Sequence, residues 1–244
     1  IELFSEEIPA KLQIDARQKI SQSIGEKLNK KEISFKSNNF FSTPNRLVIV
    51  IDGIPEKIEQ NKKIIKGPKV DAPQIALQGF IKSNNLIKSD IYKKVIDKGE
   101  FYFATTKSKV INVLNELQSI IPESLQNYSW KKSMKWSTYE LNWGRPLKSI
   151  VAIFNNKVIN FNFFHLYSSD LTYINEIDSD KGKKVSDFKS YQNLLKNKNI
   201  ILEQEKRTDL IKKKINNFCN SKNLQNKFNE KLLEEVVNLV EKPQ

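Results

Sequence analysis

The sequence has 244 residues, of which 28% are charged and 39% are hydrophobic, and these proportions exclude a disordered chain. No run of residues approaches the roughly 18 apolar positions of a membrane helix, and the first residues lack the order of a signal peptide. The single cysteine, Cys219, and the single histidine, His165, exclude a disulfide framework and the usual Cys/His zinc site. We therefore expect a cytoplasmic protein without a metal.

The net charge of +13 indicates an anionic partner, and nucleic acid is the common one. However, only four of the 41 basic residues are arginine, and asparagine and isoleucine are abundant. A strong A+T bias in the coding DNA produces the same mixture. The charge alone leaves both explanations open.

The first third of the chain is expected to form a strand, a helix and a second strand. Residues 2–4 suit a short strand, and after Pro9 an apolar residue recurs at every fourth position, which predicts a helix to about residue 29. A turn at residues 42–45 precedes a β-branched run, residues 46–51, that predicts a buried strand. Residues 56–66 alternate weakly and are expected to pair with it.

The middle of the chain is expected to contain two helices and two hairpins. Helices are predicted from Pro73 to about residue 84 and over residues 110–121, with Pro122 disturbing the end of the second. Hairpins are predicted around two turns. Residues 91–97 and 100–106 flank Lys98-Gly99, and residues 147–154 and 157–164 flank Asn155-Asn156.

The last third changes composition. Residues 168–187 are polar and indicate a long loop, and helical patterns follow at 187–197, 204–219 and 228–241. The fold class predicted is α+β, a mostly antiparallel sheet domain with flanking helices followed by a helical region. We place the sheet domain at residues 1–166, a linker at 167–186 and the helical region at 187–244.

Motifs for catalysis are absent from the sequence. It has neither a glycine-rich phosphate loop nor a G-x-S-x-G elbow, and spacing gives His165 no nucleophile or carboxylate partner. We interpret His165 as a structural residue at a strand end and Cys219 as a packed thiol. No catalytic or metal-binding residue is predicted.

Two segments combine basic residues with a surface pattern. Residues 130–136 (WKKSMKW) and 143–146 (WGRP) interleave aromatic and basic residues, which suits base stacking and phosphate contacts, although a core tryptophan with a solvated lysine rim explains them as well. The basic helix at 204–219 has the same two readings. Lys62, Lys63, Lys66 and Lys69 are interpreted as a solvated edge.

Eight short segments, in order along nearly the whole chain, resemble the β subunit of bacterial heterotetrameric glycyl-tRNA synthetase. Residues 42–47, for example, are similar to the family's Thr-Pro-Arg-Arg-Leu, and residues 134–136 to its Met-Arg-Trp. The segments are 5–10 (SEEIPA), 42–47 (STPNRL), 66–68 (KGP), 97–100 (DKGE), 134–136 (MKW), 145–146 (RP), 205–207 (EKR) and 232–241 (LLEEVVNLVE). Each alone is weak, but the ordered set is specific.

The resemblance implies an α₂β₂ enzyme. In that family the α subunit carries the class II site for ATP, Mg²⁺ and glycine, while β is needed for tRNA binding and transfer. The family's β subunit continues into further domains, so we expect this chain to be an N-terminal fragment that contains no cofactor site. The expected partners are the α subunit and tRNA-Gly. Candidate tRNA or partner contacts are Arg46, Lys135, Trp136 and Arg145.

Two departures and three alternatives stay open. Residues 173–176 (YINE) stand where the family has Gly-His-Arg-Phe, and Lys242 replaces a tryptophan. Each motif arginine is alternatively a buried ion-pair member, with Glu6 or Glu7 as partner. The chain is alternatively a stand-alone RNA-binding module, or a scaffold whose apolar faces dock the α subunit or further C-terminal domains, which predicts exposed apolar patches at its C-terminal end.

Overall fold

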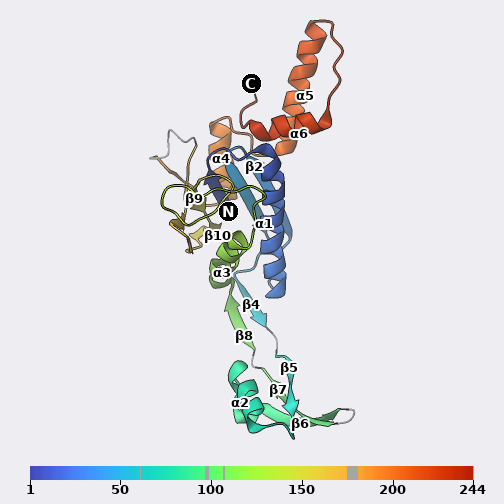
Figure 1. The fold of residues 1–244 in the computed structure, drawn as a ribbon, viewed down its shortest axis with the longest axis vertical. Coiled ribbons are helices and arrows are strands. Elements are labelled where there is room, and N and C mark those ends of the chain that lie inside the picture. Colours follow the sequence, from blue (N-terminus) through green and yellow to red (C-terminus); the bar gives the residue numbers. More distant parts are fainter. Residues whose placement is uncertain (61, 97–98, 107, 175–180, 244) are drawn as a thin grey trace. The chain divides into compact units, whose positions relative to one another are not determined.

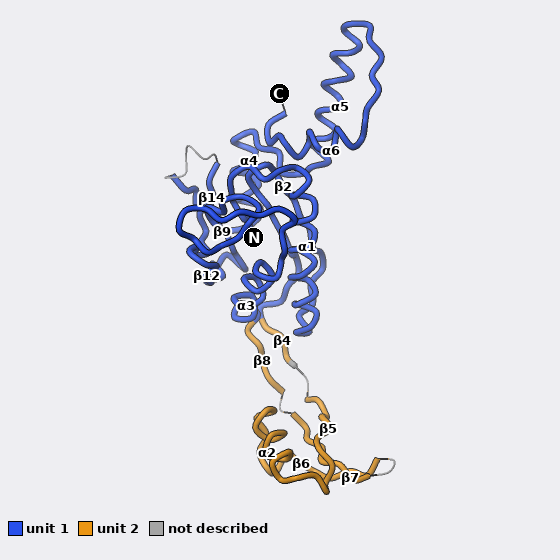
Figure 2. The backbone as a smooth tube through the Cα atoms, viewed as in Figure 1, with its two compact units in different colours: residues 1–56, 113–244 blue, residues 57–112 orange. Residues whose placement is uncertain are grey.

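The computed structural model describes residues 1–60, 62–96, 99–106, 108–174 and 181–243. The chain forms two compact units, Ile1–Glu56 with Val113–Gln244 (unit 1) and Lys57–Asn112 (unit 2) (Figure 2). The fold is α+β, as predicted. The predicted division into a sheet domain, a linker at residues 167–186 and a helical region does not coincide with these two units. It stays a prediction. No described helix is long and apolar enough to cross a membrane.

Unit 1 is built on a six-stranded sheet with the order β12-β13-β9-β1-β3-β2. Figure 1 labels two of its strands, β2 and β9. Its strands are β1 (Glu2–Ser5), β2 (Ser37–Thr43), β3 (Arg46–Asp52), β9 (Leu147–Val151), β12 (Asn162–Phe163) and β13 (Leu166–Ser169). Neighbours run antiparallel except β13 and β9, which are parallel. The predicted strands at 2–4 and 46–51 are confirmed, and β1 lies between β3 and β9.

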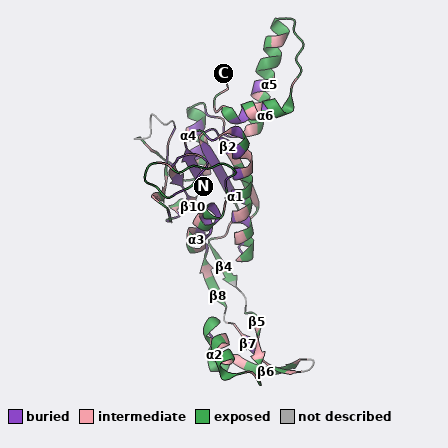
Figure 3. Cartoon of the chain, viewed as in Figure 1, coloured by how far each residue is buried: buried purple, intermediate pink, exposed green. Residues whose placement is uncertain are grey.

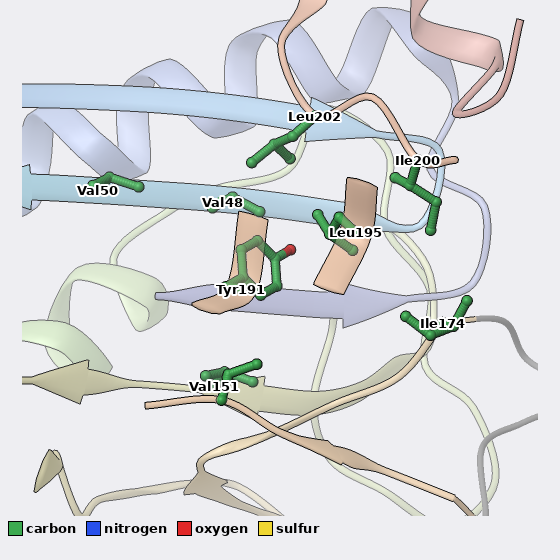
Figure 4. Packing of buried hydrophobic residues seen from close by; sticks show 9 residues of the cluster. Val48, Val50, Val151, Ile174, Tyr191, Leu195, Ile200 and Leu202 are labelled. Atoms are coloured by element: carbon green, nitrogen blue, oxygen red, sulfur yellow. The ribbon is translucent and has the colours of Figure 1, made fainter. Parts of the chain in front are cut away.

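Two helices enclose this sheet. Helix α1 (Ala10–Lys30) confirms the prediction and packs on β2 and β3, with its apolar stripe buried. Helix α4 (Phe188–Asn197) packs on the other side, where Tyr191 and Leu195 meet Val48 and Val50 of β3 (Figure 4). Because successive residues of a strand point to opposite faces, Leu47 and Ile49 are left for the α1 side. The helix next to the predicted linker thus belongs to the main core.

Helix α3 (Val113–Gln126) corrects the predicted helix at both ends. Residues 109–112 form strand β8 instead of a first helical turn, and the helix runs through Pro122. Proline removes one helical hydrogen bond, but Ile121 and Leu125 bury the same apolar face on both sides of it. Burial of that face outweighs the missing bond.

The hairpin at Asn155-Asn156 is confirmed in its turn and wrong in its length. Both asparagines have positive φ, 52° and 60°, as the tight turn requires, and they join β10 (Ile153–Phe154) to β11 (Lys157–Val158). The flanking strands pair elsewhere, since β9 pairs with β1 and β13. Burial between these two partners competes successfully with a longer hairpin.

The C-terminal part carries α5 (Gln204–Ser221) and α6 (Glu230–Leu239), so the three predicted helices after residue 187 are confirmed. Ile211, Leu233 and Val237 form a small core between α5 and α6. The predicted linker contains part of β13 and the short pair β14 (Leu171–Thr172) and β15 (Lys183–Lys184). Residues 175–180, including half of the departure at 173–176, lie outside the described residues.

Unit 2 combines a ribbon, a small sheet and a helix. The ribbon is β4 (Lys57–Gln60) with β8 (Lys109–Asn112), and the sheet has the order β5-β7-β6. Its elements are β5 (Ile64–Lys69), α2 (Gln74–Ser83), the 3-10 turn η1 (Lys88–Asp90), β6 (Ile91–Ile96) and β7 (Gly99–Thr105). Helix α2 and the β6–β7 hairpin are confirmed, although its turn at residues 97–98 lies outside the described residues.

One prediction for this region is wrong. Residues 56–66 do not pair with the strand at 46–51, because β4 pairs with β8 and β5 with β7. The neighbours of β3 are already β1 and β2. Few side chains of unit 2 are buried compared with unit 1 (Figure 3).

Candidate nucleic-acid and partner interface

Arg46, the first residue of β3, is fully buried. Its Nε lies 3.3 Å from Oε2 of Glu2 without hydrogen-bond geometry, and Nη1 donates to the Glu241 carboxylate. Nη2 donates to the carbonyl oxygens of Tyr173 at 2.5 Å and Ile174 at 2.9 Å. One guanidinium therefore ties the sheet to the loop after β14 and to the end of the chain.

The carboxylate of Glu2 completes this buried network. Thr172 donates to it at 2.6 Å, and the Tyr191 hydroxyl donates to its other oxygen. Burial raises the pKa of Glu2, and the charge of Arg46 opposes that rise. For Arg46 burial works to lower the pKa, but Glu241 and Glu2 together raise it. Arg46 is therefore charged at neutral pH.

Arg46 is thus buried in the protein and not placed on its surface, where a direct partner contact would lie. It belongs to a buried ion pair, the alternative considered from the sequence, but its partners are Glu2 and Glu241 and not Glu6 or Glu7. Glu6 instead lies 3.5 Å from Lys148. A direct contact from Arg46 to tRNA stays a prediction and requires this network to open.

Arg207 is a second buried arginine, and it explains part of the basic helix at 204–219. It donates to four backbone carbonyl oxygens, those of Val237, Ile201, Leu202 and Ser42, at 2.6 to 3.0 Å. Burial lowers its pKa to about 10. This arginine joins α5, α6 and β2, so it does not face a ligand.

The segment from Trp130 to Pro146 is divided between core and surface. Trp130 and Trp143 are buried and meet edge to face with ring centroids 5.0 Å apart. Gly144 lies so close that a Cβ there would be 2.4 Å from the Trp130 ring. Two of the three tryptophans therefore serve the core.

Trp136 lies with Tyr139 and His165 in a cluster that we call the aromatic patch. The rings of Tyr139 and His165 stack at 3.6 Å with an interplanar angle of 6°, and Trp136 meets His165 edge on at 5.9 Å. Tyr139 is 40% exposed, and Phe164, beside His165 at the tip of the β12–β13 hairpin, is 49% exposed. Aromatic surface is therefore offered to a partner.

The lysines next to the patch are exposed. Lys135 precedes Trp136 and has no ion pair among the described residues, while Lys131 lies 3.7 Å from Asp15. Arg145 is partly buried, with its Nη1 3.4 Å from the Gly144 carbonyl oxygen. Of the four candidates, Trp136 belongs to the patch, Lys135 is the exposed residue before it in the sequence, and Arg46 lies in the separate buried network.

The patch suits binding better than proton transfer. Burial lowers the pKa of His165, so the ring is neutral at pH 7, and its Nδ1 has no hydrogen-bond partner among the described groups. Aromatic faces beside an unpaired ammonium are the combination that holds bases and phosphates. The sequence missed Tyr139 and His165 as neighbours of Trp136, because they meet through folding and not through spacing.

A hollow of about 340 Å³ in unit 1 has a different character. Its lining includes Glu2, Asp52 and Asp187 and, among the described residues, neither lysine nor arginine. Such a lining repels a polyphosphate. No group of His, Cys, Asp and Glu in the described part of the chain is arranged to hold a metal ion.

Comparison with known proteins finds a matching family and several relatives. Residues 1–244 match the sequence profile of the family described as glycyl-tRNA synthetase beta subunit. The glycine–tRNA ligase beta subunit of Rickettsia typhi is 36% identical over 243 residues, which cover 100% of this chain and 36% of that protein. Those of Rickettsia prowazekii and Rickettsia bellii are 35% and 36% identical, with 36% and 37% of their lengths covered. The chain thus spans little more than a third of these relatives.

Proposed function

Because the chain belongs to the family of glycyl-tRNA synthetase beta subunits, we propose that it helps to bind and position tRNA-Gly for ATP-dependent glycylation. It acts as the N-terminal part of a β subunit within an α₂β₂ synthetase of the cytoplasm. The family match over the whole chain carries this proposal. ATP, Mg²⁺ and glycine bind to the α subunit.

The tRNA role is supported by the aromatic patch with Lys135. Trp136 and Tyr139 offer rings, and Lys135, the residue before Trp136, is exposed and has no ion pair among the described residues, so it can pair with a phosphate. A subunit that holds the acceptor in place raises the rate by orientation and needs no acid or base of its own. Arg145 is a further candidate contact at the end of the same segment.

A second role, docking of the α subunit, is favoured by the C-terminal helices. Large apolar side chains on α5, on α6 and between them are exposed, including Phe218 at 61% and Leu232 at 60%. Exposed apolar side chains gathered in one region mark interaction surfaces. The scaffold alternative predicted such side chains at this end, so assembly with α is a proposed function beside tRNA binding.

The test is fluorescence anisotropy of labelled tRNA-Gly with the 244-residue chain, against a non-cognate tRNA, in a salt series. We expect binding that weakens steeply with salt and favours the cognate tRNA. Equal affinity for both tRNAs reduces the role to general electrostatic attraction. Absence of binding at moderate salt contradicts the tRNA role and leaves docking of the α subunit.

A further inference from the structure

Unit 2 carries an unusual share of the positive charge. Residues 57–112 contain twelve lysines, no arginine and five acidic residues, so more than half of the net charge of +13 falls in less than a quarter of the chain. A small module with this balance attracts polyanions. The question is whether its lysines are scattered or gathered on one surface.

The strand register gathers three of them beside aromatic rings. Residues paired directly across antiparallel strands share a face, and so do alternate residues of one strand. In β7, Phe101 and Phe103 therefore share a face, and their partners lie with them. The partners are Lys66 and Lys69 on β5 and Tyr92 and Lys94 on β6.

We call this surface the lysine–aromatic face. The Lys66 Nζ lies 3.7 Å from the centroid of the Phe101 ring, and the Lys69 Nζ lies 5.9 Å from it. The rings of Tyr92 and Phe103 stack with centroids 6.0 Å apart. Phe103 is 7% exposed and packs beneath the ring of Tyr92, whereas Tyr92 is 39% exposed and available to a ligand.

The charges of this face are not neutralised. Lys66, Lys69 and Lys94 are exposed, and within the described residues no carboxylate forms an ion pair with any of them. Glu100 pairs with Val95 and lies next to Phe101 in β7, so its side chain points to the opposite face. An anion approaching the lysine–aromatic face therefore meets ammonium groups that no described carboxylate pairs with.

From this geometry we infer that the lysine–aromatic face of unit 2 binds an RNA strand with unpaired bases. The three ammonium groups pair with successive phosphates, and a base stacks on Tyr92. The sequence interpretation treated Lys62, Lys63, Lys66 and Lys69 together as a solvated edge. The strand register instead places Lys66 and Lys69 beside aromatic rings, so we assign these two to the RNA-binding face. That this strand is an unpaired part of tRNA rests on the proposed function, whereas the site itself rests on the geometry of unit 2.

The charge half of the inference is tested with a fluorescein-labelled oligouridylate of 12 nucleotides and the whole 244-residue chain. The variant K66Q/K69Q/K94Q removes three charges from the face. The matched control K82Q/K88Q/K93Q removes three charges from the same unit, from α2, η1 and the opposite face of β6. We expect the first variant to reduce the slope of log affinity against log salt by about 2, and the control to leave it nearly unchanged.

The stacking half is tested at Tyr92. Tyr92→Leu keeps apolar cover over Phe103 but removes the ring, whereas Tyr92→Phe keeps the ring. We expect Tyr92→Leu to weaken binding about fivefold or more with an unchanged salt slope, and Tyr92→Phe to bind as the parent chain does. A 12-base-pair RNA duplex is expected to ignore Tyr92, since its bases are not free to stack.

Other outcomes overturn the inference. If the two triple variants reduce the affinity and the salt slope equally, the oligonucleotide is held by general electrostatic attraction. If K66Q/K69Q/K94Q binds as the parent chain does, the face does not bind RNA. Vesicles containing phosphatidylserine are a parallel probe, and binding to them without binding to the oligonucleotide identifies an anionic membrane surface instead. Photocrosslinking of a 4-thiouridine oligonucleotide to the unaltered chain is independent of the variants, and crosslinks confined to unit 1 also refute the inference.

The inference and the proposed function fail separately. If tRNA binds the chain and K66Q/K69Q/K94Q leaves that affinity unchanged, the proposed function stands and the inference is lost. If the oligonucleotide binds the face but tRNA-Gly has no advantage over other RNA, the site stands and the tRNA role of this chain is lost.

Discussion

Unit 1 buries two of the four arginines of the chain, whereas unit 2 contains no arginine and exposes most of its lysines. In unit 1 the guanidiniums of Arg46 and Arg207 find fixed acceptors, a carboxylate and two backbone carbonyls for Arg46 and four backbone carbonyls for Arg207. A planar group with five donors can satisfy such a buried set, and a compact ammonium cannot. Charge thus holds unit 1 together and is left available to a ligand in unit 2.

The cores differ in the same direction. Unit 1 buries long runs of β3 and α1, whereas the buried hydrophobic residues described in unit 2 are Leu86, Phe103 and Ala104. A unit of this size with so small a core is expected to have low stability. All three tryptophans lie in unit 1, so tryptophan fluorescence reports the unfolding of that unit separately.

The largest effect is expected for Arg46→Met. The substitution leaves the buried carboxylate of Glu2 and the partly buried carboxylate of Glu241 without their cation, and loss of one partner from a buried pair costs about 3–5 kcal/mol. The free energy of unfolding of unit 1, measured from urea curves followed by tryptophan fluorescence, should fall by that amount. If the two units unfold independently, the far-ultraviolet circular dichroism signal of unit 2 should persist at urea concentrations that have already unfolded unit 1 of the variant.

Arg145→Met is the matched control for that measurement. Arg145 is partly exposed and has one weak contact, at 3.4 Å, to a carbonyl oxygen. Its removal should change the unfolding free energy by less than about 1 kcal/mol. If both variants lose the same amount, the buried network is not what distinguishes Arg46.

Arg207→Met should have the next largest effect. It removes the guanidinium donor from the carbonyl oxygens of Ser42, Leu202 and Val237, and each buried group left unsatisfied costs about 1–3 kcal/mol before relaxation. We expect a net loss of about 2–4 kcal/mol from the same urea curves. A loss that appears only as increased proteolysis after α5, with unchanged tryptophan unfolding, would confine the role of Arg207 to the C-terminal helices.

The parts of this fold that the sequence predicts are those determined by local periodicity. Helix α1 follows from an apolar residue at every fourth position, and β3 from an uninterrupted β-branched run. Contacts between distant residues do not leave such a pattern. The pair Arg46 and Glu241 is separated by 195 positions, and neither Glu6 nor Glu7, the nearby carboxylates, takes its place.

The candidate site was predicted to the same extent. The alternation of aromatic and basic residues over 130–136 and the family resemblance identify Lys135 and Trp136, but the stacked pair of Tyr139 and His165 forms only when the loop meets a hairpin tip. In unit 2 the sequence shows that lysines are abundant but not which aromatic rings they contact. The register of three strands places Phe101 beside Lys66, and that register is a property of the folded sheet.

A smaller effect is expected in the pH dependence of unit 1. Burial raises the pKa of Glu2 above its ordinary value of 4.5, so the folded state keeps a proton that the unfolded chain has lost. The stabilisation from this group is therefore complete below pH 4.5 and is lost as the pH rises through the raised pKa. The stability of the parent chain relative to Glu2→Gln should fall with pH, by at most about 1.4 kcal/mol per unit.

Urea curves of both proteins between about pH 4 and pH 8 measure this difference. Glu7→Gln, a change of the same charge at an exposed position, is the control. A constant difference between parent and Glu2→Gln across the range would mean that Arg46 holds Glu2 ionised in spite of its burial.

The smallest effect is expected for Trp136→Leu, and it decides how the two units divide RNA binding. Loss of one stacking ring costs about 1 kcal/mol or more, so the affinity for tRNA-Gly should fall about fivefold, while Trp136→Phe should retain most of it. Anisotropy with the same tRNA also compares Trp136→Leu with Tyr92→Leu in unit 2. If both weaken binding and their effects add, unit 1 and unit 2 contact the RNA independently of each other. If only Tyr92→Leu matters, the aromatic patch of unit 1 serves a protein partner, and the contrast between the units becomes one between assembly and RNA contact.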